Sequence, residues 1–552
     1  MRPTTKIIDR MQAQSTDKQR GMIALQILAI LFVAAALRFN HIRQPLVDAF
    51  SWRESSTATI ADNFYRTSWN IFYPEVSWTG PGPSYQGREF QTASYLAALL
   101  YQIFGERDWV GRSVSVLFGL TGIFALYQLT RRVWDEKRAR IAAAVMAIIP
   151  GSVFIERSFL PDAAMVALVV TACWMLVAYL QTDGFHYLLL AGLIGAWGFC
   201  TKIPGLIIGL PMAYAIVAIN GRKRLVEAKN LSALALFAVM SLAPVVAYYF
   251  WARHLAFSYP PYHFAGEGNW LWDDGLKSWL AQGYFLSRLA QRFKDWMWTA
   301  PVIVLVAVGL LIEFKRKKPS SDESSSDEPR RARWFFHWWM IAGVVFYIIG
   351  AKELVKNPWN FHIINPAAAA LAGSAIVSIS EIAKRAKWRI ISPAIAVALL
   401  VVILIYGRDG LQWMYKPYAI EGRTLGLALH DVTRSGDLVI TMANDLGDPV
   451  AIYYSQRRGW VFPPAERGRA WDELPKDDNE SIALFDELRT KGAAWLGIVE
   501  KHRQDLSENH PVLFEYMNRV CELKIGNSEF SIYRIRSPEE IAVNTNERTE
   551  GR

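Results

Sequence analysis

Apolar segments long enough to cross a lipid bilayer recur along the first ~405 residues, since a spanning helix needs about 17 to 25 mainly apolar residues. The first of them follows twenty polar and basic residues and has no small-residue cleavage site, so we interpret it as a retained span rather than a secretory signal. The expected spans lie near residues 21–38, 110–130, 140–156, 163–180, 186–201, 204–219, 231–250, 299–313, 334–350, 363–380 and 390–406.

One apolar segment is too short for this pattern. Gln91 to Gly105 (QTASYLAALLYQIFG) is apolar but only about 15 residues long, short of the roughly 20 that a span needs. If it crossed the membrane, every later basic loop would change sides. We therefore predict that it lies in the outer interface as an amphipathic helix, or that a weak further span restores the parity. The fold class is an all-α polytopic membrane domain with about 11 to 13 transmembrane helices.

The pattern changes after residue ~410, where short apolar stretches alternate with polar ones. Strands are expected at 437–443, 493–499 and 530–535, and helices at 448–455 and 511–520. This is typical of a small α/β domain. The predicted organisation is an N-terminal tail at 1–20, a transmembrane domain at 21–408, an α/β domain at 411–540 and a disordered tail at 541–552. A Ser-rich charged insert at 315–333 is predicted to be disordered.

Composition agrees with a membrane protein, because 52% of the residues are hydrophobic and only 20% are charged. That balance excludes a disordered chain and disfavours an ordinary soluble enzyme. The net charge of +10 is explained by topology, because all five basic stretches fall on one side of the predicted spans, and Lys and Arg accumulate in cytoplasmic loops. We therefore expect a bacterial inner-membrane protein with a cytoplasmic N-terminus and a periplasmic C-terminal domain, and no nucleic-acid partner. The basic stretches are the N-terminus, 131–140, 222–229, 315–333 and 384–389.

The first outer loop, residues 40–92, contains ionisable residues that topology does not explain. Three of its carboxylates are candidates, and arginines directly precede two of these three. Alternating charges can also serve only to solvate a loop, so each residue has that second interpretation. The candidates are Asp48, Arg53, Glu54, Arg88 and Glu89.

Shorter outer connections add further candidates, and charges buried deep in the hydrocarbon cost on the order of 2 to 4 kcal/mol each. The simpler interpretations are a helix cap for Asp162, an interfacial Arg157 and a snorkelling Lys202. Lys202 lies on the side where lysine is scarce, which favours an anionic ligand. The candidates are Glu156, Arg157 and Asp162 in IERSFLPD, Lys202 in CTKIPG and His362 in NPWNFHIINP.

Carboxylates and cations gathered on one membrane face suit a group transfer. A carboxylate accepts a proton from a hydroxyl nucleophile, and cations stabilise a departing phosphate. No phosphate-binding glycine loop, Ser-His-Asp order or HExxH motif is present. Because no nucleotide pool is expected outside, the donor should be an activated group already in the membrane.

The chain resembles the polytopic glycosyltransferases of the GT-C fold, particularly the bacterial relatives of protein O-mannosyltransferases and of lipid A aminoarabinose transferases (glycosyltransferase family 39-like). The resemblance covers about residues 20 to 410. It rests on the acidic first loop, WRESSTATIADNFYR, GREFQTASYLAALLYQIFGERDWVGR, ERSFLPDAAM, FCTKIPG and NPWNFHIINP.

The resemblance implies transfer of a sugar from a polyprenyl-phosphate carrier to an acceptor hydroxyl, with inversion at the anomeric carbon. The acceptor would be a glycan, a lipid or a protein. By similarity, Glu54 or Glu89 is the base, and Asp162 helps to shape the catalytic site or to hold a metal. The residues implied to contact the lipid phosphate are Lys202, Arg157 and His362.

One position departs from the pattern of the family. Many members begin the first-loop motif with Asp-Glu, whereas this chain has Arg53-Glu54, so the leading aspartate is missing. Asp48 lies upstream and is a substitute for it. Some members bind a divalent metal cation and others do not, which leaves metal dependence open.

A non-enzymatic hypothesis stands beside this one. A transporter of lipid-linked saccharides, or flippase, with an outer sensor domain would share the carrier and the topology. Transporters place charges near the bilayer midplane, often on broken helices arranged as repeats. The predicted spans are nearly free of charge at their centres, which favours the enzyme.

Overall fold

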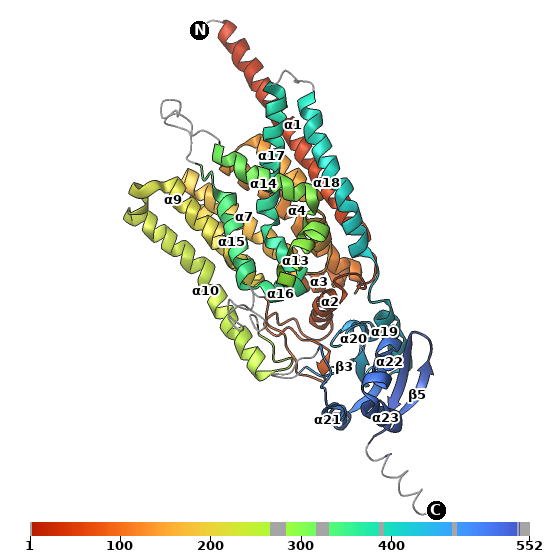
Figure 1. The fold of residues 1–552 in the computed structure, drawn as a ribbon. Helices are drawn as coiled ribbons and strands as arrows, with labels where there is room; N and C mark the ends of the chain where they lie inside the picture. Colours follow the sequence, from red (N-terminus) through yellow and green to blue (C-terminus); the bar gives the residue numbers. More distant parts are fainter. Residues whose placement is uncertain are drawn as a thin grey trace, which may run out of the picture.

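Long apolar helices form a bundle, and a small sheet lies beyond one end of it, as the computed structural model shows (Figure 1). The described residues are 3–264, 283–315, 331–385, 391–465, 472–537 and 540. Most of the insert predicted at 315–333, and the whole tail predicted at 541–552, lie outside them.

The first half of the bundle is built by helices that run back and forth along its long axis. α7 is the most enclosed of them, because its side chains are almost all apolar and 83% of its most apolar window is buried. In chain order the helices are α1 (Pro3–Phe39), α2 (Ser51–Arg66), α3 (Thr92–Phe104), α4 (Asp108–Val133), α5 (Glu136–Ile148), α6 (Pro150–Arg157), α7 (Pro161–Thr182), α8 (Phe185–Thr201), the 3-10 helix η1 (Ile203–Ile208), α9 (Gly209–Leu225) and α10 (Ala228–Ser258).

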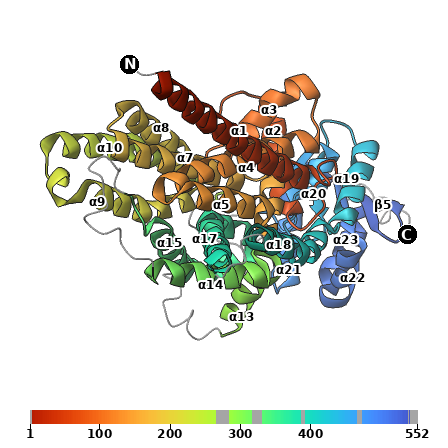
Figure 2. The same cartoon turned by 90° about the horizontal axis from the view of Figure 1, so that it is seen from above.

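The second half packs against α5 and α4 and completes the bundle. Seen from above, α9 and α10 form one edge, on the side away from α18 and the C-terminal domain (Figure 2). The helices are α13 (Gly283–Arg292), the π-helical η2 (Phe293–Met297), α14 (Thr299–Lys315), α15 (Phe335–Ile349), α16 (Ala351–Lys356), the 3-10 helix η3 (Pro358–Ile364), α17 (Asn365–Arg385) and α18 (Ile391–Tyr415).

The apolar segments predicted as spans are helical throughout the part of the chain that the structure describes. Seven helices there are long and apolar enough to cross a membrane, or nine when each of two bent pairs counts as one span. The two other predicted spans lie on the shorter apolar helices α8 and α15. The predicted all-α polytopic class is therefore confirmed.

One predicted span is not a single helix. The segment 140–156 is divided, because α5 ends before Ile149 and α6 begins at Pro150, with a bend of 63° between them. Proline has no N–H for the preceding turn but suits the first position of a helix. At the last predicted span, 390–406, the helix α18 continues to Tyr415, since the end of an apolar run marks the membrane boundary and not the end of the helix.

The first outer loop contains regular structure that the sequence did not predict. α2 occupies Ser51–Arg66 and buries most of its residues, including the charged Arg53 and Glu54. The helix expected near 91–105 is α3, which buries Tyr101 and exposes Ile103. Its helical state is confirmed, and its place in the interface stays a prediction.

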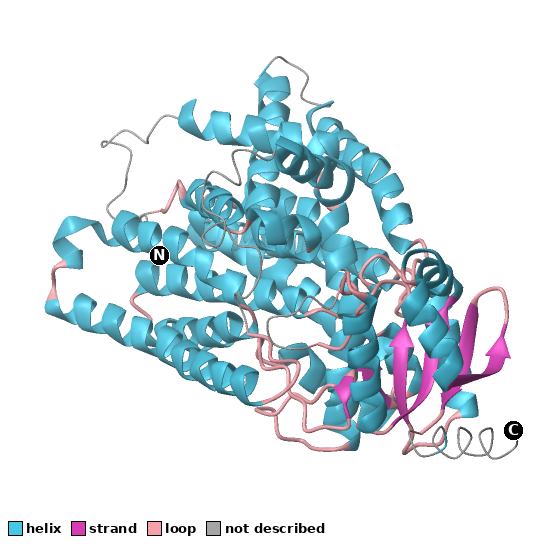
Figure 3. Ribbon diagram, turned by 60° about the horizontal axis from the view of Figure 1, so that its bottom comes forward, coloured by secondary structure: helices cyan, strands magenta, loops and turns pink. Residues whose placement is uncertain are grey.

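The C-terminal domain contains a mixed sheet of six strands in the order β1-β3-β2-β4-β6-β5. The central β3, β2 and β4 are parallel, and β6, β5 and β1 join antiparallel to their neighbours. Figure 3 shows the strands gathered at one corner of a helical molecule. The elements are β2 (Leu438–Met442), β3 (Arg458–Val461), β4 (Ala493–Val499), β5 (Cys521–Gly526), β6 (Phe530–Ile535), α19 (Ile420–Val432), α20 (Val450–Ser455), α21 (Asp478–Thr490), α22 (Glu500–Asn509) and α23 (Pro511–Val520).

The edge strand β1 (Thr79–Gly80) comes from the first outer loop, not from the C-terminal domain. Thr79 pairs with Trp460 of β3, and Arg458 donates to Glu75 of the loop over 2.6 Å. This ion pair packs Arg458 against the loop. The first outer loop and the C-terminal domain therefore form one folded unit.

Candidate active site

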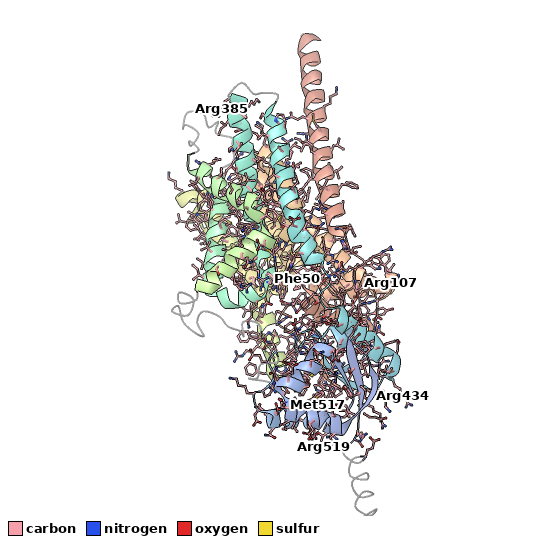
Figure 4. The ribbon with its side chains drawn as sticks, turned by 45° about the vertical axis from the view of Figure 1, so that its right-hand side comes forward. Phe50, Arg107, Arg385, Arg434, Met517 and Arg519 are labelled. Atoms are coloured by element: carbon pink, nitrogen blue, oxygen red, sulfur yellow. The ribbon has the colours of Figure 1, made fainter. Side chains whose placement is uncertain are left out.

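Three groups of buried ionisable side chains lie at the end of the bundle that faces the C-terminal domain. This end includes Phe50, which starts the α2 segment, while Arg385 lies at the opposite end (Figure 4). Buried charges are stable only when paired and hydrogen-bonded, so the pairing decides what each can do.

The first group, the Arg112 cluster, joins α4 to the first outer loop and comprises Arg112, Glu54, Asp48 and Arg157. Arg112 donates to both carboxylate oxygens of Glu54, over 2.8 and 2.7 Å, and to Asp48 over 2.9 Å. Arg157 also pairs with Asp48, and all four side chains are fully buried. The backbone N–H of Phe159 donates to Glu54 over 2.7 Å, so both oxygens of Glu54 are occupied.

The second group, the Arg38 cluster, joins α1, α6 and η3. Arg38 donates to Glu156 over 2.6 Å, and Nε2 of His362 lies 3.1 Å from the other carboxylate oxygen. The Asn365 amide donates to Nδ1 of His362 over 3.1 Å, which orients the imidazole beside Glu156. This group fixes three elements to one another and is fully enclosed.

The third group lies at a small cavity, here named the Lys202 hollow, and comprises Lys202, Asp162, Glu89, Arg53 and Arg88. Glu89, Arg53 and Arg88 line the cavity, and Lys202 pairs with Asp162 beside Glu89. Lys202, between α8 and η1, donates to Asp162 over 2.7 Å and lies 4.0 Å from Glu89. Glu89 pairs directly with Arg53 of α2. The cavity, whose wall includes Glu89, Arg53 and Arg88, has a volume of about 10 Å³, enough for about one water molecule.

Charge balance in the Lys202 hollow is positive, with three cations to two carboxylates. Burial raises the pKa of Glu89, but Arg53, Arg88 and Lys202 outweigh it and lower that pKa to about 2. Glu89 is therefore ionised at physiological pH. Asp162 is fully buried, and its Oδ2 has no hydrogen-bond partner among the described residues.

A second loop closes over the hollow. Tyr85 of the first loop donates its N–H to Pro260, which follows α10, over 2.9 Å, and Arg88 lies 3.2 Å from Nε2 of His263. Burial, with Arg88 and Arg53 nearby, lowers the pKa of His263 to about 3, so this imidazole is neutral. Tyr248 of α10 donates to the carbonyl of Glu89 over 2.6 Å, which holds the backbone of the loop in place.

The candidates from the sequence fall into different groups. Lys202, Asp162, Glu89 and Arg53 meet in the Lys202 hollow, and Asp162 with Lys202 forms a direct pair. Arg157 lies in the Arg112 cluster with Asp48 and Glu54, and His362 lies with Glu156 in the Arg38 cluster. Three residues proposed to contact one phosphate are therefore distributed over three groups.

Arg38 and Arg112 were missed because each was counted within an apolar span. A signal was present for both. Arg38 ends the first predicted span and Arg112 begins the second, so both lie on the predicted outer side, where the positive-inside bias predicts few arginines.

The described residues do not fit a metal site. No group of three or more His, Cys, Asp or Glu side chains among them is arranged to hold a metal ion. The Lys202 ammonium also lies within 4.0 Å of both carboxylates of the hollow, where a cation would be repelled. No step proposed below uses a metal.

Comparison with known proteins gives a partial family match and a full-length match of fold. Residues 92–248 match the dolichyl-phosphate-mannose-protein mannosyltransferase family. YkcB of Bacillus subtilis (strain 168), whose name describes it as a candidate mannosyltransferase, is 27% identical over 240 residues, which are 41% of this chain and 31% of YkcB. The chain thus covers about a third of this curated relative.

Two solved structures share the fold over nearly the whole chain. ArnT from Cupriavidus metallidurans in the apo state has a TM-score of 0.64 at 14% identity, covering 94% of this chain and 98% of ArnT. AglB from Archaeoglobus fulgidus is an oligosaccharyltransferase, solved in complex with an inhibitory peptide and a dolichol-phosphate. It has a TM-score of 0.56 at 14% identity, covering 93% of this chain and 74% of AglB. The predicted GT-C fold is confirmed.

Proposed function

We propose that this chain is a membrane glycosyltransferase that moves a sugar from a polyprenyl-phosphate-linked donor to an acceptor hydroxyl on the outer face of the inner membrane. The observation that carries the proposal is the Lys202 hollow, where an ionised Glu89 lines a cavity with Arg53 and Arg88 and lies 4.0 Å from Lys202. The GT-C fold supports it. So does the ArnT structure described as bound to undecaprenyl phosphate, which has a TM-score of 0.58.

The chemistry needs an anion site and a base. Lys202, Arg53 and Arg88 would hold the donor phosphate and stabilise its charge as it leaves. The acceptor oxygen attacks the anomeric carbon from the opposite side, and the bond from that carbon to the phosphate oxygen breaks. The electron pair stays on the phosphate, and the acceptor proton passes to a carboxylate. This displacement inverts the anomeric configuration.

Glu89 is the base that this geometry favours. Glu54, the other candidate, binds Arg112 with both oxygens and the N–H of Phe159 with one. It is thereby suited to holding α2 against α4. Glu89 lines the cavity, and its side chain is 15% exposed. Asp162 would orient Lys202 toward the phosphate.

Substrate entry requires the hollow to open. A cavity of about 10 Å³ cannot hold a sugar phosphate. The roof consists of loop segments joined by few hydrogen bonds, with Tyr85 and Ser84 bonded to Pro260. Movement of the segment at Pro260 away from the first loop would open the site without unpacking a span.

A transfer assay tests the function. The purified full chain in lipid nanodiscs is given a radiolabelled polyprenyl-phosphate sugar and an envelope extract, and labelled acceptor is counted. Lys202→Gln and Asp162→Asn should each reduce transfer by at least about tenfold. Lys202→Gln removes the contact with the phosphate, and Asp162→Asn removes the carboxylate that orients Lys202. Translocation of the intact lipid-linked sugar with no transfer would instead identify a transporter and refute the proposal.

A pH profile tests the electrostatics of the base. Because Arg53 is the largest contribution that lowers the pKa of Glu89, Arg53→Gln should raise this pKa toward its ordinary value of 4.5. Wild-type transfer should not decline with acid until the pH nears the pKa of about 2, whereas the variant should lose activity as the pH falls through about 4 to 5. The same decline of activity at low pH in wild type and in Arg53→Gln would rule out Glu89 as the base. Arg66→Gln, which acts on Glu106 instead, is the control.

A further inference from the structure

A groove unrelated to the Lys202 hollow lies between η2, the segments on either side of it, and α18. Its volume is about 580 Å³, far larger than the hollow. Arg288, Arg292 and Lys294 line it together with Trp296, Tyr406 and Trp413. Figure 2 shows α13 and α14 beside α18 at the side of the bundle.

A sharp bend creates the groove. Ser287–Met297 and Thr299–Ile312 meet at 105°, so the chain turns sharply between η2 and α14. Leu289 and Phe293 pack against the main core. The basic residues at neighbouring positions, Arg288, Arg292 and Lys294, line the groove. This division of apolar and basic side chains is typical of an amphipathic helix at a membrane interface.

Aromatic side chains stack along the wall. The rings of Trp296 and Trp413 lie 4.5 Å apart, and the Arg292 guanidinium lies 3.9 Å above Trp296. Tyr406 and Trp413 are 58% and 52% exposed. Tryptophan and tyrosine with basic residues are typical of the level of lipid headgroups.

Apolar surface continues from the groove along both helices. Val304 lies one turn beyond the groove residue Ala300 on α14, and Val402 lies one turn before Tyr406 on α18. Residues four apart share a helix face, and both valines are exposed, at 59% and 36%. A lipid headgroup in the groove would therefore have an apolar track for its acyl chain.

The charges select the kind of lipid. Three basic side chains face two carboxylates, Asp295 and Asp409, so the lining carries one net positive charge. A phosphodiester carries one negative charge, and carboxylates accept hydrogen bonds from hydroxyl groups. A zwitterionic choline headgroup lacks both the net charge and the hydroxyls.

The groove is separated from the Arg112 cluster by α18 itself. Trp413 lines the groove, whereas Tyr415, two residues later, lies over Arg157 at 5.0 Å and contacts the Arg112 cluster. We propose that this groove binds one anionic glycerophospholipid with a hydroxylated headgroup, its phosphate on Arg288, Arg292 and Lys294.

Native mass spectrometry of the full chain tests this site. The protein is incubated with equal amounts of phosphatidylglycerol and phosphatidylcholine, and retained lipid is counted. Wild type should retain phosphatidylglycerol at least about tenfold better, because each basic residue near a lipid surface is worth about 1 kcal/mol. The triple variant R288Q/R292Q/K294Q should lose the preference.

Two controls make the result specific. K491Q/R519Q/K524Q removes the same charge from the C-terminal domain and should retain the preference. Lys202→Gln should retain it as well, which separates the groove from the proposed transferase site. Equal retention of the two lipids by wild type, or an unchanged preference in the groove variant, would overturn the proposal. A Tm within a few degrees of wild type confirms that the groove variant is folded.

Discussion

Glu89→Gln should abolish most sugar transfer, with a fall in kcat of about 100-fold to 10,000-fold, the usual contribution of a general base. Glutamine keeps the size of the side chain and can still contact Arg53 and Lys202, but it cannot accept the acceptor proton. Because the phosphate site remains, KM for the lipid-linked donor should change little. Initial rates at several donor concentrations separate the two parameters.

Glu75→Gln is the matched control. Glu75 lies in the same loop and pairs with an arginine, Arg458, but it does not line the hollow. Its replacement should leave kcat within about threefold of wild type, as expected for a partly exposed ion pair. Equal losses in both variants would show that the loop is merely sensitive to charge, and the proposed role of Glu89 would fail.

Arg112→Met should be the most destabilising single change in the chain, by about 3 to 5 kcal/mol. The substitution leaves two fully buried carboxylates, Glu54 and Asp48, without their shared guanidinium. Thermal unfolding in detergent should show a clear decrease in Tm, even though methionine fills much of the same volume.

A double variant tests whether uncompensated buried charge causes this loss of stability. Adding Glu54→Gln to Arg112→Met removes one uncompensated charge and should recover part of the lost Tm. Arg66→Met breaks a bidentate pair with Glu106 that is partly exposed, and should lower stability by no more than about 1 kcal/mol. A double variant less stable than Arg112→Met would refute the explanation.

The sequence predicted the spans well because each depends on a local run of apolar residues. It also identified Asp162, Lys202 and Glu89, since a charge beside a hydrophobic helix is conspicuous. It could not assign partners, because Arg157 pairs with Asp48, which lies 109 positions away. Which buried cation meets which carboxylate is decided by helix packing, and no local pattern records it.

The Lys202 hollow also depends on pairing between residues far apart in the sequence. Arg53 was noticed as the residue in place of an expected aspartate, but its role depends on Glu89, 36 positions later. The sequence analysis predicts no helix in the first outer loop, because the buried face of α2 is made largely of Ser, Thr and Ala. Small polar residues at a buried helix face carry little periodic signal.

The pairing of β1 with β3 affects the biogenesis of the chain. Thr79 is synthesised 460 − 79 = 381 residues before its partner Trp460. During all of that synthesis the first loop has no sheet to join, so its final structure must wait until the membrane spans are inserted and the C-terminal domain has folded. A chain interrupted after α18 would therefore have a full set of spans and an immature catalytic loop. Correct folding of the C-terminal domain, which is synthesised last, would decide whether the first loop becomes functional.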